Sequence, residues 1–120
     1  MECIIIAADR TIRDKREALK EVLHYVRRAG ADIEEARKTG GKAMADITRM
    51  IRRHIPEHTH DAIVQSLRID LNVINYMNLD VDKDGLRQIM DLAVEGRILS
   101  APVDIDAFAD ESFSADISVK

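Results

Sequence analysis

The sequence is poor in the residues that build disulfide scaffolds, rigid turns and aromatic surfaces. Its 120 residues include one cysteine, two prolines, two tyrosines, two phenylalanines and no tryptophan. Because Cys3 is alone, no disulfide can form within the chain, and its apolar neighbours favour a small buried side chain over a nucleophile. Four aromatic residues are too few for a base-stacking surface. Disulfide scaffolds and single-strand nucleic-acid platforms are therefore excluded.

The chain also lacks a surplus of positive charge and any long apolar run. Its formal net charge is −4, whereas binding to phosphates needs an excess of Lys and Arg on one face, so we expect no nucleic-acid partner. No apolar stretch approaches 18 residues, and the start, MECIIIAADR, has no basic region of a signal peptide. As written, the chain is expected not to insert into a membrane, and to stay in the cytoplasm.

What is present is the balance of a folded protein. Apolar residues make up 46% and charged residues 33%, without repeats or low-complexity tracts. A chain of this length can bury one hydrophobic core, so we expect residues 1–120 to form a single domain.

Most of the chain has helical periodicity. Residues 9–37 carry apolar side chains three or four positions apart, and Gly40 and Gly41 end this pattern. A second helix follows and is stopped by Pro56, and Thr59 caps a short third helix. The side chains expected to face inward are Leu19, Val22, Val26, Ala29 and Ile33 in the first helix, Met44, Ile47, Ile51 and Ile55 in the second, and Ile63, Leu67 and, if the helix extends that far, Leu71 in the third.

The second half is less regular. Residues 71–79 lose the helical period and are predicted to form an extended or irregular connection. A fourth helix is predicted from Lys83 to Glu95, with Gly96 as its C-terminal cap, and a short helical turn near residues 106–108. The inward side chains of the fourth helix are expected to be Leu86, Ile89, Met90 and Ala93.

Residues 3–8, CIIIAA, are the exception to this helical pattern. Three successive isoleucines in an apolar run predict a strand buried on both faces of a sheet. The fold class expected is therefore mainly α with one N-terminal β-strand. A lone strand leaves its backbone groups unpaired, so either another chain supplies the neighbouring strands or the sequence is part of a larger α/β domain.

One stretch has half of a calcium-binding motif. Asp80, Asp82 and Asp84, followed by Gly85, match positions 1, 3, 5 and 6 of an EF-hand loop. Position 12 is Asp91, whose arm is short for the usual bidentate contact, and the preceding residues are not helical. The favoured interpretation is that Asp82 or Asp84 caps the fourth helix, with no metal site, while a calcium sensor remains the minority alternative.

His54, His58 and His60 lie close together in the sequence, but Pro56 separates them, which favours an exposed turn over a metal site. The motifs of serine hydrolases, P-loop proteins, dinucleotide-binding folds and zinc proteases are all absent. We therefore expect no enzyme, no catalytic residue and no cofactor.

The tail from Gly85 to Phe113, GLRQIMDLAVEGRILSAPVDIDAFADESF, resembles the C-terminal end of the solute-binding proteins of ABC importers for nitrate, sulfonate, taurine and pyrimidine-type thiamine precursors. The residues that carry the resemblance are the Gly96 to Leu99 turn, Pro102, Val103, Asp104, Phe108, Asp110 and Phe113. Residues 3–33 are similar to that family's late strand and the long helix after it.

This resemblance implies a partial lobe of an α/β periplasmic-binding-protein fold, acting as a scaffold and hinge in the import of a small anion or pyrimidine precursor. The implied partners are the missing N-terminal lobes and, through the parent protein, a transporter permease; the implied location is the periplasm. Ligand-contacting residues stay unknown, because the parts of the lobes that carry them are not in this sequence. The alternative is a free-standing helical module that forms homo-oligomers with a second copy through residues 3–8.

Overall fold

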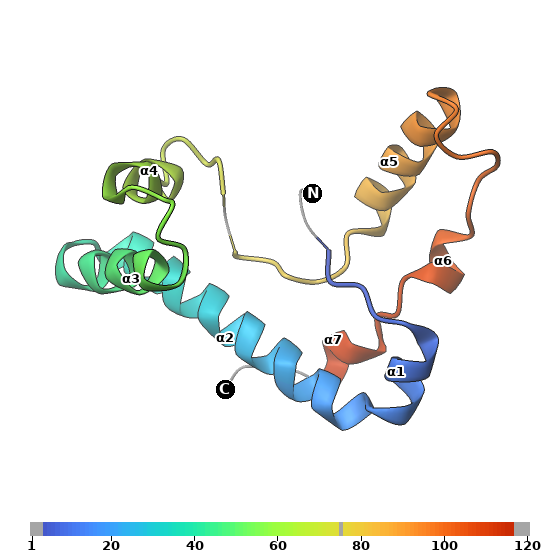
Figure 1. Cartoon of the computed structure of the whole chain (residues 1–120), viewed down its shortest axis with the longest axis horizontal. Helices are drawn as coiled ribbons and strands as arrows, with labels where there is room; N and C mark the ends of the chain where they lie inside the picture. The colour runs from blue at the N-terminus through green and yellow to red at the C-terminus, as the bar shows by residue number, and fades with distance from the viewer. Residues whose placement is uncertain (1–3, 75, 117–120) are drawn as a thin grey trace. The chain divides into compact units, whose positions relative to one another are not determined.

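The structure, a computed structural model, describes residues 4–74 and 76–116. Within these residues the regular secondary structure is entirely helical, and no strand is present (Figure 1). The chain is therefore mainly α, as predicted. The helices are α1 (Asp9–Asp14), α2 (Arg16–Thr39), α3 (Gly41–His54), α4 (His60–Ser66), α5 (Lys83–Glu95), α6 (Ile105–Phe108) and α7 (Ser112–Asp116).

The chain divides into two compact units. Unit 1 consists of Met1–Leu23 and Asp80–Lys120, and unit 2 consists of His24–Leu79. The division falls inside α2, so the first two turns of this helix belong to unit 1 and the rest belongs to unit 2. The expectation of one domain over residues 1–120 stays a prediction.

Unit 2 is built from the C-terminal part of α2 together with α3 and α4. Gly40 separates α2 from α3, and Gly41 begins α3; their φ angles are 66° and 53°, in a region that residues with a Cβ rarely adopt. The helix predicted to stop before Pro56 ends at His54, and the Thr59 hydroxyl accepts a hydrogen bond from the amide of Ala62, as expected for a cap. The predicted end of α3 and the predicted start of α4 are therefore confirmed.

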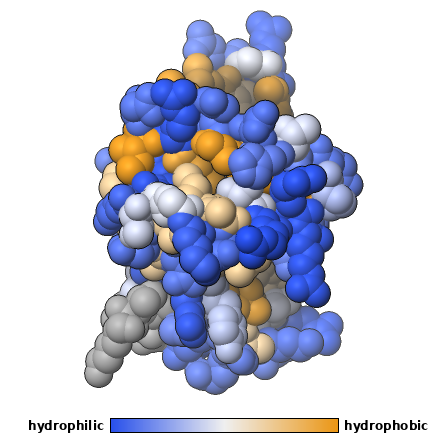
Figure 2. Space-filling model, turned by 90° about the vertical axis from the view of Figure 1, so that its left-hand side faces the viewer, coloured by the Kyte–Doolittle hydropathy of each residue, from blue (hydrophilic) through white to orange (hydrophobic). Residues whose placement is uncertain are grey.

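The core of unit 2 is small. Its buried apolar residues are Ala36 of α2, Ile63 of α4 and Leu67, the C-cap of α4. Met50 and Ile55 are exposed, and Figure 2, which looks onto the α3 and α4 end of this unit, shows apolar residues at the surface among polar ones. Unit 2 thus leaves uncovered a substantial part of the apolar surface that its helices provide.

Unit 1 combines α1, the start of α2, and the three helices after residue 82. Helix α5 spans Lys83–Glu95, with Asp82 as its N-cap and Gly96 as its C-cap, and all three features match the prediction. The predicted turn near residues 106–108 is α6, which the Asp104 carboxylate caps. Helix α7 was not predicted. The fully buried apolar residues of unit 1 are Ile105 and Phe113.

The predicted strand at residues 3–8 is absent from the part that the structure describes. Cys3 lies outside the described residues, and residues 4–8 have no strand assignment. Their isoleucines are exposed, most of all Ile6 at 75%. Because the described residues include no other strand, residues 4–8 have no edge with which to pair.

Further expectations are wrong. The single helix expected from residue 9 onward is broken at Lys15, which separates α1 from α2. The residues expected to face inward are not uniformly buried, since Val22 and Val26 of α2 are 54% and 40% exposed, and Ile55, Leu71 and Ile89 are also exposed. The periodicity identified α2 correctly, but few residues of the chain are available to cover its apolar stripe.

Candidate functional site

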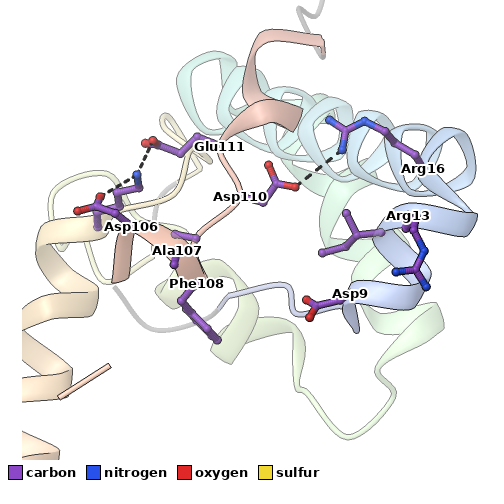
Figure 3. Close-up of a pocket in the computed structure, with 11 residues that line it drawn as sticks. Asp9, Arg13, Arg16, Asp106, Ala107, Phe108, Asp110 and Glu111 are labelled. Carbon is purple, nitrogen blue, oxygen red and sulfur yellow. Dashed lines mark hydrogen bonds and ion pairs between the residues drawn. The ribbon is translucent and has the colours of Figure 1, made fainter. Parts of the chain in front are cut away.

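A hollow of about 550 Å³ lies within unit 1 (Figure 3). One side is formed by α1 and the first residue of α2, and the other by Lys83 and the segment from α6 toward α7. Most of its lining is charged: Asp9, Arg13, Arg16, Lys83, Asp106, Asp110 and Glu111. Ile12 and Phe108 add apolar surface. This is the candidate site whose geometry we describe.

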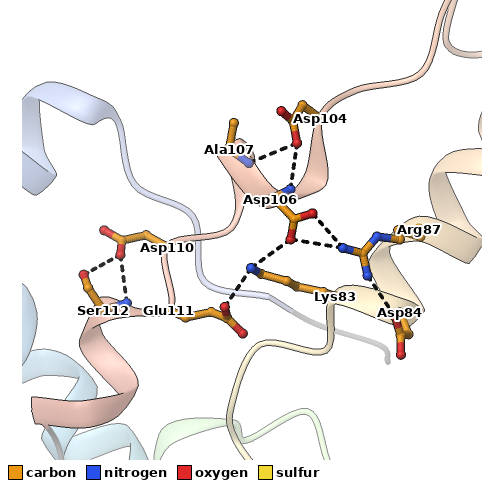
Figure 4. Close-up of polar contacts among 9 residues, drawn as sticks. All are labelled: Lys83, Asp84, Arg87, Asp104, Asp106, Ala107, Asp110, Glu111 and Ser112. Atoms are coloured by element: carbon orange, nitrogen blue, oxygen red, sulfur yellow. Dashed lines mark hydrogen bonds and ion pairs between the residues drawn. The ribbon is translucent and has the colours of Figure 1, made fainter.

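Two cations of α5 hold the segment that contains α6 (Figure 4). The Lys83 ammonium lies 3.0 Å from Oδ1 of Asp106 and 2.7 Å from Oε2 of Glu111. The Arg87 guanidinium contacts both carboxylate oxygens of Asp106, at 3.0 and 2.9 Å, and also Asp84 at 2.8 Å. Lys83 and Arg87 stand one helical turn apart, so both reach the same carboxylate. We call Lys83, Arg87, Asp106 and Glu111 the α5 ion cluster.

Arg16, at the start of α2, holds the segment that follows α6. Its guanidinium donates to the Ser112 hydroxyl at 2.6 Å, lies 3.8 Å from the Asp110 carboxylate, and stacks 4.1 Å from the centroid of the Phe113 ring. Asp110 in turn accepts hydrogen bonds from the amide and the hydroxyl of Ser112. Arg16 therefore joins two segments of unit 1 that are almost a hundred residues apart in the chain.

These contacts shift the protonation of the groups involved. Hydrogen bonds from Lys83 and Arg87 lower the pKa of Asp106, and hydrogen bonds to Glu111 and Asp106 raise the pKa of Lys83. The hydroxyl and amide of Ser112 lower the pKa of Asp110. Each of these shifts favours the charged form of its group.

The arrangement is suited to holding chain segments together. The cations and carboxylates of the α5 ion cluster are paired with each other. Because these side chains are partly exposed, each pair contributes modestly to stability, although it holds the two chain segments in place. Together with the Arg16 contacts, these pairs tie the tail of the chain to the starts of α2 and α5.

The predicted calcium ligands do not surround a common point. The Asp82 carboxylate accepts a hydrogen bond from the Gly85 amide at 2.9 Å, and Asp84 pairs with Arg87. Gly85 belongs to α5, although the sixth residue of an EF-hand should form a turn within the loop. Asp91 is exposed on α5, and Asp80 precedes the helix. Among the described residues, no group of three or more acids, histidines or cysteines is placed to hold a metal ion.

The three clustered histidines are exposed in and around the turn between α3 and α4. His54 ends α3, His58 lies in the turn, and His60 begins α4, where its Nδ1 lies 3.2 Å from a carboxylate oxygen of Asp61. The break in the helix that was expected at Pro56 is present, between the end of α3 at His54 and the start of α4 at His60.

Sequence reasoning missed the α5 ion cluster and the contacts of Arg16. A signal for the cluster was available in the i, i+4 spacing of Lys83 and Arg87 beside an acidic tail. The acids at 104, 106 and 110, each near the start of a short helix, were a signal for caps. The pairing of Arg16 with Ser112 had no local signal, because it joins distant parts of the chain.

A scan of protein-family models found no match to this chain, and searches of curated proteins and of solved structures found no similar protein. Within the residues that the structure describes, none of the helices is both long enough and apolar enough to cross a membrane.

Proposed function

We propose that this chain is the C-terminal scaffold and hinge part of a solute-binding protein that serves an ABC importer. The observation that carries the proposal is the exposed run Ile4 to Ile6. Three neighbouring isoleucines left in water favour a missing partner, because each forgoes roughly 1.5 to 3 kcal/mol of burial. In the proposed parent protein, residues 3–8 add a strand to a sheet built by the N-terminal lobes.

The ordered tail supports the proposal. Four of the ten residues that carry the family resemblance have a defined structural role: Gly96 ends α5, Asp104 caps α6, Asp110 accepts hydrogen bonds from Ser112, and Phe113 is buried under Arg16. In unit 1, the contacts of Arg16 and Lys83 fold this closing segment back onto the starts of α2 and α5.

The proposed role involves no catalysis. The chain braces one lobe while the parent protein closes around a small anion or a pyrimidine precursor in the periplasm and delivers it to the transporter permease. The ligand-contacting residues would lie in the N-terminal lobes, so the isolated chain should not bind solute.

An immunoblot of a denatured extract of the source organism, with an antibody against this chain, tests the proposal. A band well above 13.5 kDa that is released with the periplasmic fraction by osmotic shock is expected. A band at 13.5 kDa would overturn the proposal, because the cell would then contain the chain by itself.

The exposure of Ile4 to Ile6 also favours a second candidate, a free-standing module that self-associates through residues 3–8. Analytical ultracentrifugation of the purified chain tests it. Dimers that dissociate on replacing Ile5 with Lys would support self-association, and a monomer at high concentration would exclude it. Glu17→Lys, an exposed change of charge on α2, is the matched control.

A further inference from the structure

The part of unit 1 that follows Pro102 meets the rest of the unit through opposite charges. We call residues 104–116 the acidic segment, because they contain five Asp or Glu residues and no Lys or Arg. We call Arg16, Lys83 and Arg87 the cation cradle. The ion pairs between the two are Lys83 with Asp106 and Glu111, Arg87 with Asp106, and Arg16 with Asp110 (Figures 3 and 4). In each pair the cation belongs to the cradle and the carboxylate to the acidic segment.

The acidic segment also supplies the buried apolar side chains described in unit 1. Ile105 is 7% and Phe113 is 8% exposed, and the Arg16 guanidinium lies 4.1 Å from the centroid of the Phe113 ring. The cradle thus holds a peptide that carries acidic and apolar side chains at a defined spacing. In the structure, that peptide is residues 104–116 of the same chain.

The connection that leads to the acidic segment is short and exposed. Residues 100–103, SAPV, belong to no helix and are exposed. Lys83 and Arg87 lie in the first half of α5, so the chain has to turn back after α5 to bring Asp106 to them.

Pro102 opposes this reversal, because the residue before a proline favours extended backbone. An extended connection of this length reaches about 14 Å. Packed helices lie roughly 8 to 10 Å apart, so an extended connection is long enough to carry the acidic segment to a helix beside α5.

An uncovered apolar side chain lies close to this connection. Ile98 follows α5 and is 81% exposed, more than any other large apolar residue that the structure describes. When two copies of a chain exchange a segment, their connections run beside each other, and apolar side chains there gain a partner. Exchange therefore provides cover for Ile98.

We propose that two copies of the chain exchange their acidic segments, so that residues 104–116 of each copy lie in the cation cradle of the other. The exchanged contacts are those seen within one chain, so the ion pairs and the burial of Ile105 and Phe113 are retained. The inference is independent of the proposed function. It also differs from self-association through residues 3–8, because Ile5→Lys leaves the cradle and the acidic segment unchanged.

Complementary charge reversal tests the inference in the full chain. One variant reverses the cradle with Lys83→Glu and Arg87→Glu, and the other reverses the acidic segment with Asp106→Lys. Each variant alone places like charges together, whether its segment stays in its own chain or is exchanged. In a mixture, exchange places opposite charges together in both cradles. All chains carry Ile5→Lys, which prevents association through residues 3–8.

Analytical ultracentrifugation and native mass spectrometry measure the outcome. The expected result is a 1:1 dimer in the mixture, with a mass near twice 13.5 kDa and an affinity at least tenfold higher than the self-association of either variant. A mixture that sediments as the sum of the two separate variants would overturn the inference, because each segment then stays in its own chain.

Two controls accompany the mixture. A chain that carries all three reversals has opposite charges within its own contacts, so its circular dichroism and its association should match those of the Ile5→Lys chain. Arg97→Glu mixed with Asp91→Lys is the matched control pair, since both residues are exposed and lie outside the cradle. A dimer of equal affinity from this pair would also overturn the inference, because general charge attraction would then explain it.

A second pair of variants, Arg16→Asp and Asp110→Arg, guards against a first pair that fails to fold. The same two outcomes are expected to separate exchange from its absence. The immunoblot reports on the proposed function, and its result does not affect this test.

Discussion

At the scale of single residues, the most consequential side chains of unit 2 are Glu34 and Arg37. They form a buried ion pair that also holds the backbone at Leu67 and Tyr76. Removing one member of such a pair leaves the other charge without a partner away from water, which is more costly than losing a surface contact.

Replacing Glu34 with Ala should therefore destabilise unit 2 by about 3 kcal/mol, enough to release the backbone at Tyr76. Hydrogen exchange at the Tyr76 amide measures this directly, with far-UV circular dichroism reporting on the helices. Glu35→Ala is the control, since Glu35 is exposed and accepts a hydrogen bond from the Thr39 hydroxyl, and a change within about 0.5 kcal/mol is expected. Equal exchange in both variants would show that the pair does not hold the backbone at Tyr76.

The pH dependence of unit 1 should depend on Asp106. Lys83 and Arg87 lower the pKa of Asp106 below its ordinary value of 3.8. The stability that the ionised Asp106 adds to unit 1 is therefore fully present above pH 3.8, and it is lost as the pH falls through the lower pKa of the folded state. Asp106→Asn should remove this part of the acid sensitivity. Acid titrations of both proteins, followed by the backbone signals of residues 105–113, measure the difference, with Asp91→Asn as the control. Superimposable acid transitions would contradict the assignment.

At the scale of the helices, the start of α5 depends on one cap. Asp82→Ala removes the acceptor for the Gly85 amide and should cost about 1 kcal/mol, seen as roughly fivefold faster amide exchange in the first turn of α5. Asp82→Ser retains an acceptor and should be nearly neutral. Calcium should not alter either result, because Asp82 is engaged with the helix; slower exchange on adding calcium would instead favour the metal sensor.

The sequence predicted those helices whose signals are local. The bounds of α5, its caps at Asp82 and Gly96, and the Thr59 cap of α4 all depend on neighbouring residues, and all were predicted correctly. The break at Lys15 and the short α7 were missed, and the contacts of Arg16 join residues nearly a hundred positions apart. The candidate site was missed for that reason: hydrophobic period and capping residues identify elements, but they do not say which distant side chains will meet.

At the scale of the whole molecule, the small cores should limit cooperativity. Ile105 and Phe113 are the fully buried apolar residues described in unit 1, and Ala36, Ile63 and Leu67 are those described in unit 2. Cores of this size cannot balance the entropy cost of ordering so many residues. The purified 120-residue chain should therefore unfold in urea over a broad range, with an m-value below about 1 kcal/mol/M. A single steep transition, seen identically by circular dichroism and by tyrosine fluorescence, would contradict this.

The division of the chain also has a consequence for the order in which it can fold during synthesis. Unit 2 is one continuous stretch, His24–Leu79, so every contact within it is available once Leu79 has left the ribosome. Unit 1 is assembled from both sides of that stretch, and Arg16 has to wait for Asp110, Ser112 and Phe113. During translation, Arg16 therefore leaves the ribosome well before the residues that it contacts, and it remains without these contacts until Phe113 has emerged.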